Sequence, residues 1–124
     1  MTASANTMDL ASCDFIAELY YKLPAEGGRS TPAASGYRPT IKFPFDKMYT
    51  SGAQKFIDVD KVYPGQKVKA GIKIVSTAYF AGRLYEGLEF IFTEGTTVIG
   101  TGIIMEIINS SLKRPVQDAG LPSA

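Results

Sequence analysis

The 124-residue chain contains no histidine and only one cysteine. Histidine is the commonest general base and the commonest metal ligand, so its absence removes the simplest routes to acid–base and metal-assisted catalysis. Cys13 alone forms neither an intrachain disulfide nor a thiolate metal cluster, and an unpaired cysteine is typical of a reducing cytoplasm. We therefore expect a cytoplasmic protein that is not an enzyme and that holds no metal and no cofactor.

Long apolar runs and a one-sided charge are also missing. No stretch of about 18 apolar residues is present to span a bilayer. The opening segment MTASANTMDLAS has neither the basic start nor the apolar run of a secretory signal. Thirteen basic and twelve acidic residues give a net charge of +1. No global field therefore draws the chain to a membrane or to nucleic acid, and any contact with RNA has to come from a local patch.

The sequence has no nucleotide-binding loop. It contains no G-x-x-x-x-G-K-[S/T] segment, in which backbone amides and a lysine hold the phosphates of a nucleotide. The segment Gly100-Thr101-Gly102 is not a dinucleotide-binding loop either, because no helix is predicted after it. A GTPase is therefore excluded, and we expect no bound nucleotide.

Short segments in which apolar and polar residues alternate are frequent, and this period of two predicts β-strands. Residues 14–22 place Phe15, Ala17, Leu19 and Tyr21 on one face. The same pattern recurs along the chain, so the sequence predicts short strands that each turn one face toward a common core. The further segments are residues 40–45, 53–59, 67–76, 88–95 and 96–108.

One of these segments contains a proline. In residues 40–45 the alternation places Ile41, Phe43 and Phe45 toward the core and Pro44 on the outer face. Proline cannot donate a hydrogen bond to a neighbouring strand. We therefore expect this strand at the edge of a sheet, or bulged at the proline.

Turn residues separate the segments. Pro64-Gly65 fits a type II turn, because proline fixes one φ angle and glycine accepts the positive one. Glu94-Gly95 marks a tight hairpin. With no convincing helix, we predict an all-β fold, a six-stranded antiparallel closed β-barrel, because closure removes the exposed edges of a small sheet. The barrel is expected to span residues 13–112, with flexible tails at residues 1–12 and 113–124.

The segment EGGRSTPAASGYRP, residues 26–39, is rich in glycine and proline. It resembles a segment of the C-terminal β-barrel domain of bacterial elongation factor Tu, which runs E-G-G-R-H-T-P-F-F-x-G-Y-R-P-Q-F in family form. The stretches VYPGQKVKAGIKI and EGLEFIFTEGTTVIGTGIIMEII resemble later segments of the same domain, in the same order. The resemblance covers about residues 14–108. It implies a free-standing domain with the fold of a six-stranded antiparallel barrel.

In that family the barrel contacts the backbone of the T-stem of aminoacyl-tRNA and receives the guanine-nucleotide exchange factor. The resemblance therefore implies a protein partner or a structured RNA. This chain departs from the family motifs, because Ser30 replaces a histidine, Ala33 and Ala34 replace two phenylalanines, Thr40 replaces a glutamine and Thr93 replaces an arginine. The candidates for contact with a partner or RNA are Arg29, Ser30, Arg38, Thr40, Thr93, Glu94 and Gly95.

Several of these candidates also have an architectural interpretation. Arg38, beside Tyr37, is suited to bonding the carbonyl groups of its own loop, and Gly95 is suited to forming the hairpin. For these residues we favour the architectural role. For Arg29, which has no obvious partner in an open glycine-rich loop, both interpretations stay open.

A row of lysines accompanies one predicted strand. Lys67, Lys69 and Lys73 share its outer face, with Lys42 and Lys55 on other strands. We interpret the row as the solvated face of an edge strand, where lysine opposes aggregation. No aromatic residues interleave with it to stack bases, so binding of single-stranded RNA is disfavoured.

Two functions of different classes follow from the sequence. The first is a non-catalytic binding module for a protein or structured RNA of the translation apparatus, with residues 26–39 and 93–96 as its contact surface. The alternative is a protein–protein interaction or self-assembly subunit that uses the barrel outside translation, because a shared fold does not fix a function. The oligomeric state stays open.

Overall fold

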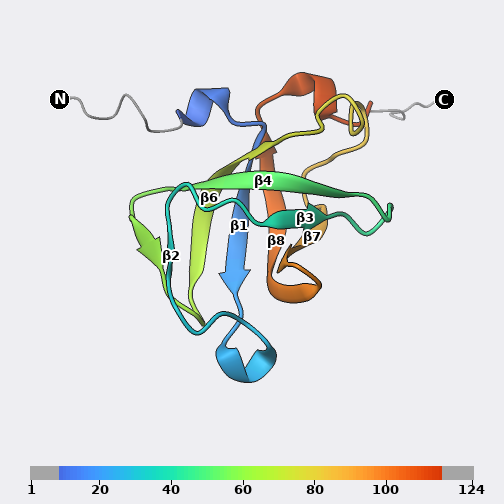
Figure 1. Ribbon diagram of the computed structural model, residues 1–124. Coiled ribbons are helices and arrows are strands. Elements are labelled where there is room, and N and C mark those ends of the chain that lie inside the picture. Colours follow the sequence, from blue (N-terminus) through green and yellow to red (C-terminus); the bar gives the residue numbers. More distant parts are fainter. Residues whose placement is uncertain (1–8, 116–124) are drawn as a thin grey trace.

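The computed structural model describes residues 9–115, which form a closed antiparallel barrel of six strands (Figure 1). Around the barrel the order is β1, β6, β4, β3, β7 and β8, and β8 pairs with β1 to complete the circle. The predicted all-β class and the six-stranded closed barrel are therefore confirmed. The barrel strands are β1 (Phe15–Tyr21), β3 (Thr40–Lys42), β4 (Tyr49–Phe56), β6 (Lys67–Ile74), β7 (Glu89–Glu94) and β8 (Thr97–Ile107).

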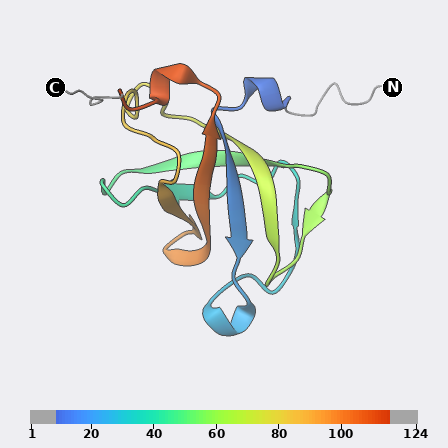
Figure 2. The ribbon, with the colours of Figure 1, turned by 180° about the vertical axis from the view of Figure 1, so that it is seen from behind.

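Two very short strands and three 3-10 helices complete the described part of the chain. β2 (Ala33–Ala34) and β5 (Lys61–Val62) form a separate two-stranded sheet beside the barrel. The helices η2 (Leu10–Ser12) and η4 (Ser110–Leu112) lie at one end of the barrel, and η3 (Pro24–Glu26) lies at the opposite end (Figure 1, Figure 2). No helix within residues 9–115 is both long and apolar enough to cross a membrane.

The two predicted tails are described only where they adjoin the barrel. η2 falls in the first of them, and in the second Lys113 forms a β-bridge with Leu84. Residues 1–8 and 116–124 lie outside the described residues.

The inward faces predicted for β1 and β6 form the core of the barrel. All four apolar residues of the predicted β1 face are buried, and the residues between them are partly exposed. Since the strands wrap around one interior, their inward faces meet in a single apolar cluster. Its aromatic rings pack at an angle to one another in two groups: Phe15, Phe43, Phe80 and Phe90 at the start of β1, and Tyr21, Phe56 and Phe92 at its end.

The segment with the proline differs from its prediction. β3 ends at Lys42 and is paired on both sides, so Pro44 lies beyond the strand rather than at an edge or a bulge. Phe45, predicted to face the core, is 40% exposed and stacks on Phe43 with ring centroids 5.7 Å apart. The alternation stops there because a residue that cannot donate to the ladder lets the chain leave the sheet.

The strand predicted for residues 53–59 begins earlier and ends earlier. β4 starts at Tyr49 and ends at Phe56, and the chain then turns through Asp58, which has a positive φ of 70°. The inward positions of β4 include Thr50 and Gln54, both buried. Polar residues on the buried face obscure the alternation from which the strand was predicted.

Two inward-facing glycines of β8 make room for two phenylalanine rings of β7. Gly100 pairs with Phe92, and Gly102 pairs with Phe90, across the hairpin. A Cβ atom added to Gly100 would lie 2.1 Å from Cζ of Phe92 and 2.6 Å from the carbonyl oxygen of Tyr20 on β1. The rings therefore occupy the space above the glycine backbone, and β8 stays close to both neighbouring strands.

A buried carboxylate fastens the end of the barrel near η2 and η4. Asp14, directly before β1, accepts hydrogen bonds from the backbone N of Ile74 (2.8 Å) and from Nδ2 of Asn109 (3.0 Å). Its backbone carbonyl accepts from the N–H groups of Ile108 and Asn109. A buried carboxylate requires such partners. Here they connect the start of β1 to the ends of β6 and β8.

The glycine in contact with both neighbouring strands gives the first prediction. Replacing Gly100 by alanine places a methyl group against the Phe92 ring and the β1 backbone, so we expect the free energy of unfolding to fall by about 2 kcal/mol. Urea denaturation followed by tyrosine fluorescence measures this change. Thr101→Ala, on the exposed outer face of the same strand, is the control and should shift stability by less than about 0.5 kcal/mol. A Gly100→Ala protein as stable as the wild type would contradict the packing.

Candidate functional site

The second half of the segment that carries the resemblance is ordered along the edge of β4, where it continues the line of β3. The backbone N of Gly36 donates to the carbonyl of Gln54 (2.7 Å), and the N of Gln54 donates to the carbonyl of Tyr37 (2.9 Å). The N of Gly52 donates to the carbonyl of Pro39 (3.0 Å). Successive backbone bonds to one strand fix the course of this segment, as they do in a sheet.

A second attachment joins the same segment to the small sheet. Ala33 is buried and pairs with Val62 in the β2–β5 sheet, and the N of Ser35 donates to the carbonyl of Asp60 (2.8 Å). The Oγ of Ser35 also accepts a hydrogen bond from the N of Phe56 (3.0 Å). Residues 33–39 are therefore held by β4 on one side and by β5 on the other.

The first half of the segment is held by what we term the Arg29 clamp, formed by Arg29, Tyr37 and Glu94. The guanidinium of Arg29 forms an ion pair with the Glu94 carboxylate and donates to the Tyr37 hydroxyl (3.3 Å). The Tyr37 hydroxyl in turn donates to the same carboxylate. These residues come from the two segments of strongest resemblance, 65 positions apart in the chain.

Arg29 also bonds its own loop. Its Nε donates to the carbonyl of Thr31 (3.3 Å), and Nη2 donates to the carbonyl of Pro32 (3.2 Å). Its guanidinium carbon lies 4.8 Å from the centroid of the Tyr37 ring, within the range of a cation–π contact. Partial burial, together with the acceptor carboxylate of Glu94, raises the pKa of the Tyr37 phenol above its usual value. The phenol therefore stays protonated and able to donate at neutral pH.

Both interpretations were open for Arg29, and its bonds within the loop and to the hairpin are those that the architectural one requires. The role expected of Arg38 needs a correction. The arginine that bonds the loop carbonyls is Arg29, whereas Arg38 is exposed and forms no hydrogen bond or ion pair with any residue between 9 and 115. Ser30 is exposed as well.

The remaining candidates lie in the β7–β8 hairpin or on β3, the strand that pairs with β7. Gly95 has a positive φ of 59° and no neighbouring atom within 4 Å of an added Cβ, as expected for the open tip of a tight turn. Thr40 is partly buried and pairs with Thr93 across β3 and β7. Thr93 is 1% exposed, so it cannot contact a partner on the outer surface.

The register of β7 and β8 shifts next to Thr93. Phe92 pairs with Gly100 and Thr93 pairs with Val98, so Ile99 is the extra residue and the bulge lies in β8. At such a bulge two consecutive residues of one strand oppose one residue of its partner, and Ile99 and Gly100 are both buried here. The hydroxyl of buried Thr93 and the Nε2 of buried Gln54 have no hydrogen-bond partner among the described residues. Gln54 Oε1 accepts from the Tyr21 hydroxyl, so this polar pair lies inside the barrel.

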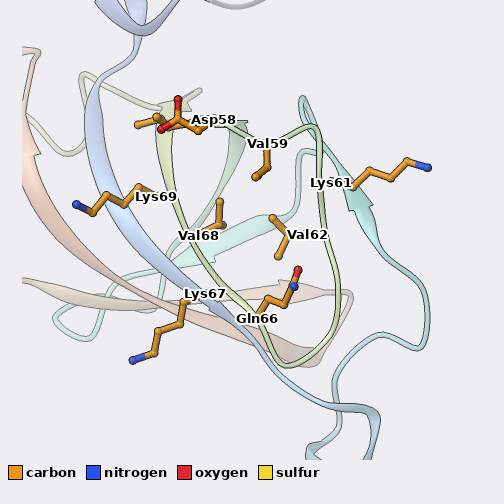
Figure 3. Close-up of a pocket in the computed structure, with 9 residues that line it drawn as sticks. Asp58, Val59, Lys61, Val62, Gln66, Lys67, Val68 and Lys69 are labelled. Carbon is orange, nitrogen blue, oxygen red and sulfur yellow. The ribbon is translucent and has the colours of Figure 1, made fainter.

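A hollow of about 320 Å³, which we call the β5–β6 hollow, lies beside the small sheet (Figure 3). It was not predicted, because its aliphatic residues come from two predicted strands and the turn between them, and only the folded turn brings them together. Valine side chains lie toward its interior, and the charged ends of the lysines at its rim point outward (Figure 3). The valines are Val59, Val62 and Val68, and the lysines are Lys61, Lys67 and Lys69.

The lysine row therefore needs one correction. Its outer-face residues are exposed along β6, but β6 pairs with β1 and β4 and is not an edge strand. Lys73 donates to the carbonyl of Ser12 (3.1 Å), while Lys67 and Lys69 border the β5–β6 hollow. One lysine of the row therefore forms a structural hydrogen bond, and the other two border the β5–β6 hollow.

Within residues 9–115, no three cysteine, aspartate or glutamate side chains are grouped so that they could hold a metal ion. The arrangement of the Arg29 clamp is that of a structural network, since each of its three side chains bonds the other two. The chain matches no protein-family model.

The clamp gives a prediction that separates its ion pair from its other bonds. Arg29 and Glu94 are 21% and 41% exposed, so solvent weakens their attraction, and we expect a coupling energy of about 1 kcal/mol from a double-mutant cycle. The cycle compares unfolding of Arg29→Ala, Glu94→Ala and the double variant with the wild type. The coupling should shrink as salt is added.

The matched control is the ion pair of Glu86 and Lys113, whose atoms lie 3.9 Å apart and whose side chains are 48–49% exposed. An exposed pair at this distance should show coupling close to zero. Equal coupling in the two cycles, or none at the clamp, would show that the clamp does not hold the loop to the hairpin.

Proposed function

We propose that the chain is a non-catalytic binding module for a protein or structured RNA of the translation apparatus. The observation that carries this proposal is the Arg29 clamp. It joins the two segments that most resemble elongation factor Tu, residues 26–39 and 93–96, into one surface at one end of the barrel. Nothing in this surface is arranged for a reaction, so binding is the activity that it supports best.

Within this surface the roles divide between positioning and contact. Arg29 and Tyr37 position the loop, because their side-chain polar groups form hydrogen bonds within the protein. Arg38 and Ser30 are exposed and available, and an unpaired guanidinium is suited to a phosphate or a carboxylate of a partner. Gly95 leaves the hairpin tip without a side chain, so a partner can approach the backbone there.

The fixed course of the loop favours binding. A flexible loop loses conformational freedom when a partner orders it, and this loss weakens the complex. Here the backbone bonds to β4 and β5 and the clamp order the segment before any partner arrives. A surface of small polar residues on such a frame suits recognition of a backbone or of a shaped protein surface.

A second candidate function, self-assembly or docking of an unrelated protein, is favoured by an apolar patch beside the β3–β4 connection. Phe45, Met48, Tyr49 and Tyr79 are each 40–48% exposed. Aromatic residues and methionine are enriched in protein interfaces. Sedimentation at several concentrations measures this directly, and a strict monomer would remove the self-assembly version.

The binding proposal is tested by retention of partners on the immobilised protein at low salt. We expect transfer RNA, the elongation factor or its exchange factor to be retained by the wild type. The Arg38→Glu variant should retain about tenfold less, which corresponds to about 1.4 kcal/mol. Charge reversal removes an attraction and adds a repulsion, so both effects act in the same direction.

Lys47→Glu, in the connection between β3 and β4, is the control with the same change of charge and should bind as the wild type does. Retention of none of the three candidates by the wild type would exclude the translation partner. Equal retention by Arg38→Glu would show that the contact surface lies elsewhere on the barrel.

A further inference from the structure

We propose that the β5–β6 hollow binds an acidic peptide segment by taking up one aliphatic side chain flanked by carboxylates. This site uses residues outside the Arg29 clamp, so the inference goes beyond the proposed function and does not depend on it. The hollow has a volume of about 320 Å³, in the lower part of the range of roughly 300–1,000 Å³ found for ligand pockets.

The interior of the hollow accepts an aliphatic group. Val62 and Val68 form its buried base, and Val59 is 46% exposed at its side (Figure 3). An aliphatic side chain of a partner would remove the exposed part of Val59 from water and bury its own surface at the same time. Among the residues that the structure describes, no aromatic residue lines the hollow. It therefore lacks the stacking surface that a nucleic acid base requires.

The rim of the hollow determines the charge of the partner. Lys61, Lys67 and Lys69 line it, against the single carboxylate of Asp58. None of the three lysines forms an ion pair with a carboxylate in the described part of the chain, although Glu18 is the cross-strand neighbour of Lys69. Unpaired lysines on flexible stems can turn toward an incoming carboxylate without breaking an existing bond.

A polar group inside the hollow is placed to hold the peptide backbone. Gln66 points into it, and its Oε1 accepts a hydrogen bond from the N of Tyr63 (2.9 Å) (Figure 3). This bond fixes the orientation of the amide, and its NH2 group has no partner among residues 9–115. A peptide carbonyl is the acceptor that this donor lacks. Aliphatic interior, basic rim and free amide donor together fit a peptide better than a free anion.

The test uses a short fluorescent peptide with one leucine between glutamates, titrated with the intact 124-residue protein. We expect saturable binding with a Kd below about 1 mM, weakened by added salt. Amide NMR shifts should change around residues 57–69. Two control peptides separate the two contributions: serine in place of leucine, and lysine in place of glutamate. Each should bind about tenfold more weakly or not at all.

Variants then locate the site. Lys61→Glu/Lys67→Glu should weaken binding about tenfold or more, and Val59→Ser should weaken it about threefold. Lys42→Glu/Lys47→Glu carries the same change of charge on β3 and its following connection and should leave binding unchanged. All the replaced side chains are at least partly exposed, so the variants are expected to fold, and far-ultraviolet circular dichroism checks this.

Other outcomes overturn the inference. They are absence of binding by the wild type, equal binding of the serine or lysine peptide, and shifts confined to residues outside the hollow. Tighter binding of an RNA hairpin than of the acidic peptide, lost in Lys61→Glu/Lys67→Glu, would assign the hollow to nucleic acid instead. Loss of partner retention by Arg38→Glu with unchanged peptide binding would show that the two surfaces act separately.

Discussion

Closure of the barrel depends on two phenylalanine rings that lie over two glycines. Phe90 and Phe92 fill the interior directly above Gly102 and Gly100, their partners on the next strand. A side chain at either glycine would push β8 away from β7 or from β1. Because β8 is the strand that joins the last hairpin to the first strand, that separation would open the circle. An open barrel would expose two strand edges and lose its shared core.

At the two ends of the barrel, hydrogen bonds and an ion pair, rather than apolar packing, connect the strands and loops. At one end the buried carboxylate of Asp14 connects the start of β1 to the ends of β6 and β8. At the other end Glu94, at the end of β7, anchors the loop that follows η3 through Arg29 and Tyr37. Both devices bring together segments distant in sequence. Apolar packing therefore sets the width of the barrel, and directional bonds fix the ends from which the loops emerge.

Much of the fold was predictable because the strand period is visible wherever the inward residues are apolar. The alternation was clear in β1 and β6. The strand predictions were wrong where a proline ended the strand or where polar residues occupied inward positions. Phe45 was placed in the core because the alternation was extended across Pro44, although the strand had already ended. The strand β4 was predicted to begin and end later than it does, and polar Thr50 and Gln54 at inward positions obscure its alternation.

The candidate site was less predictable, because its contacts depend on how the strands close. Arg29 and Glu94 were both candidates, but nothing local relates two residues 65 positions apart. The two residues meet because β7 pairs with β3, the strand that follows the loop, and this pairing brings the β7–β8 hairpin next to the loop. Thr93 was a contact candidate through the resemblance, but it is buried next to a register shift of β7 and β8 that the sequence does not reveal. The aliphatic side chains of the β5–β6 hollow come from two predicted strands and the turn between them, and no local pattern relates them.

The loop and the hollow share the small β2–β5 sheet, and this connection relates their two kinds of surface. Ala33 of the loop pairs with Val62 at the base of the hollow. The clamp neutralises the charge of Arg29, whereas the lysines of the hollow form no ion pair in the described part of the chain, so the hollow is where the proposed attraction of an acidic partner would begin. The loop, already ordered by β4, contributes a fixed shape and the single exposed charge of Arg38. Once a partner is held at one surface, contact at the other is intramolecular and costs little further entropy. The β2–β5 pairing thus connects the two proposed surfaces, so that one partner would be able to use both.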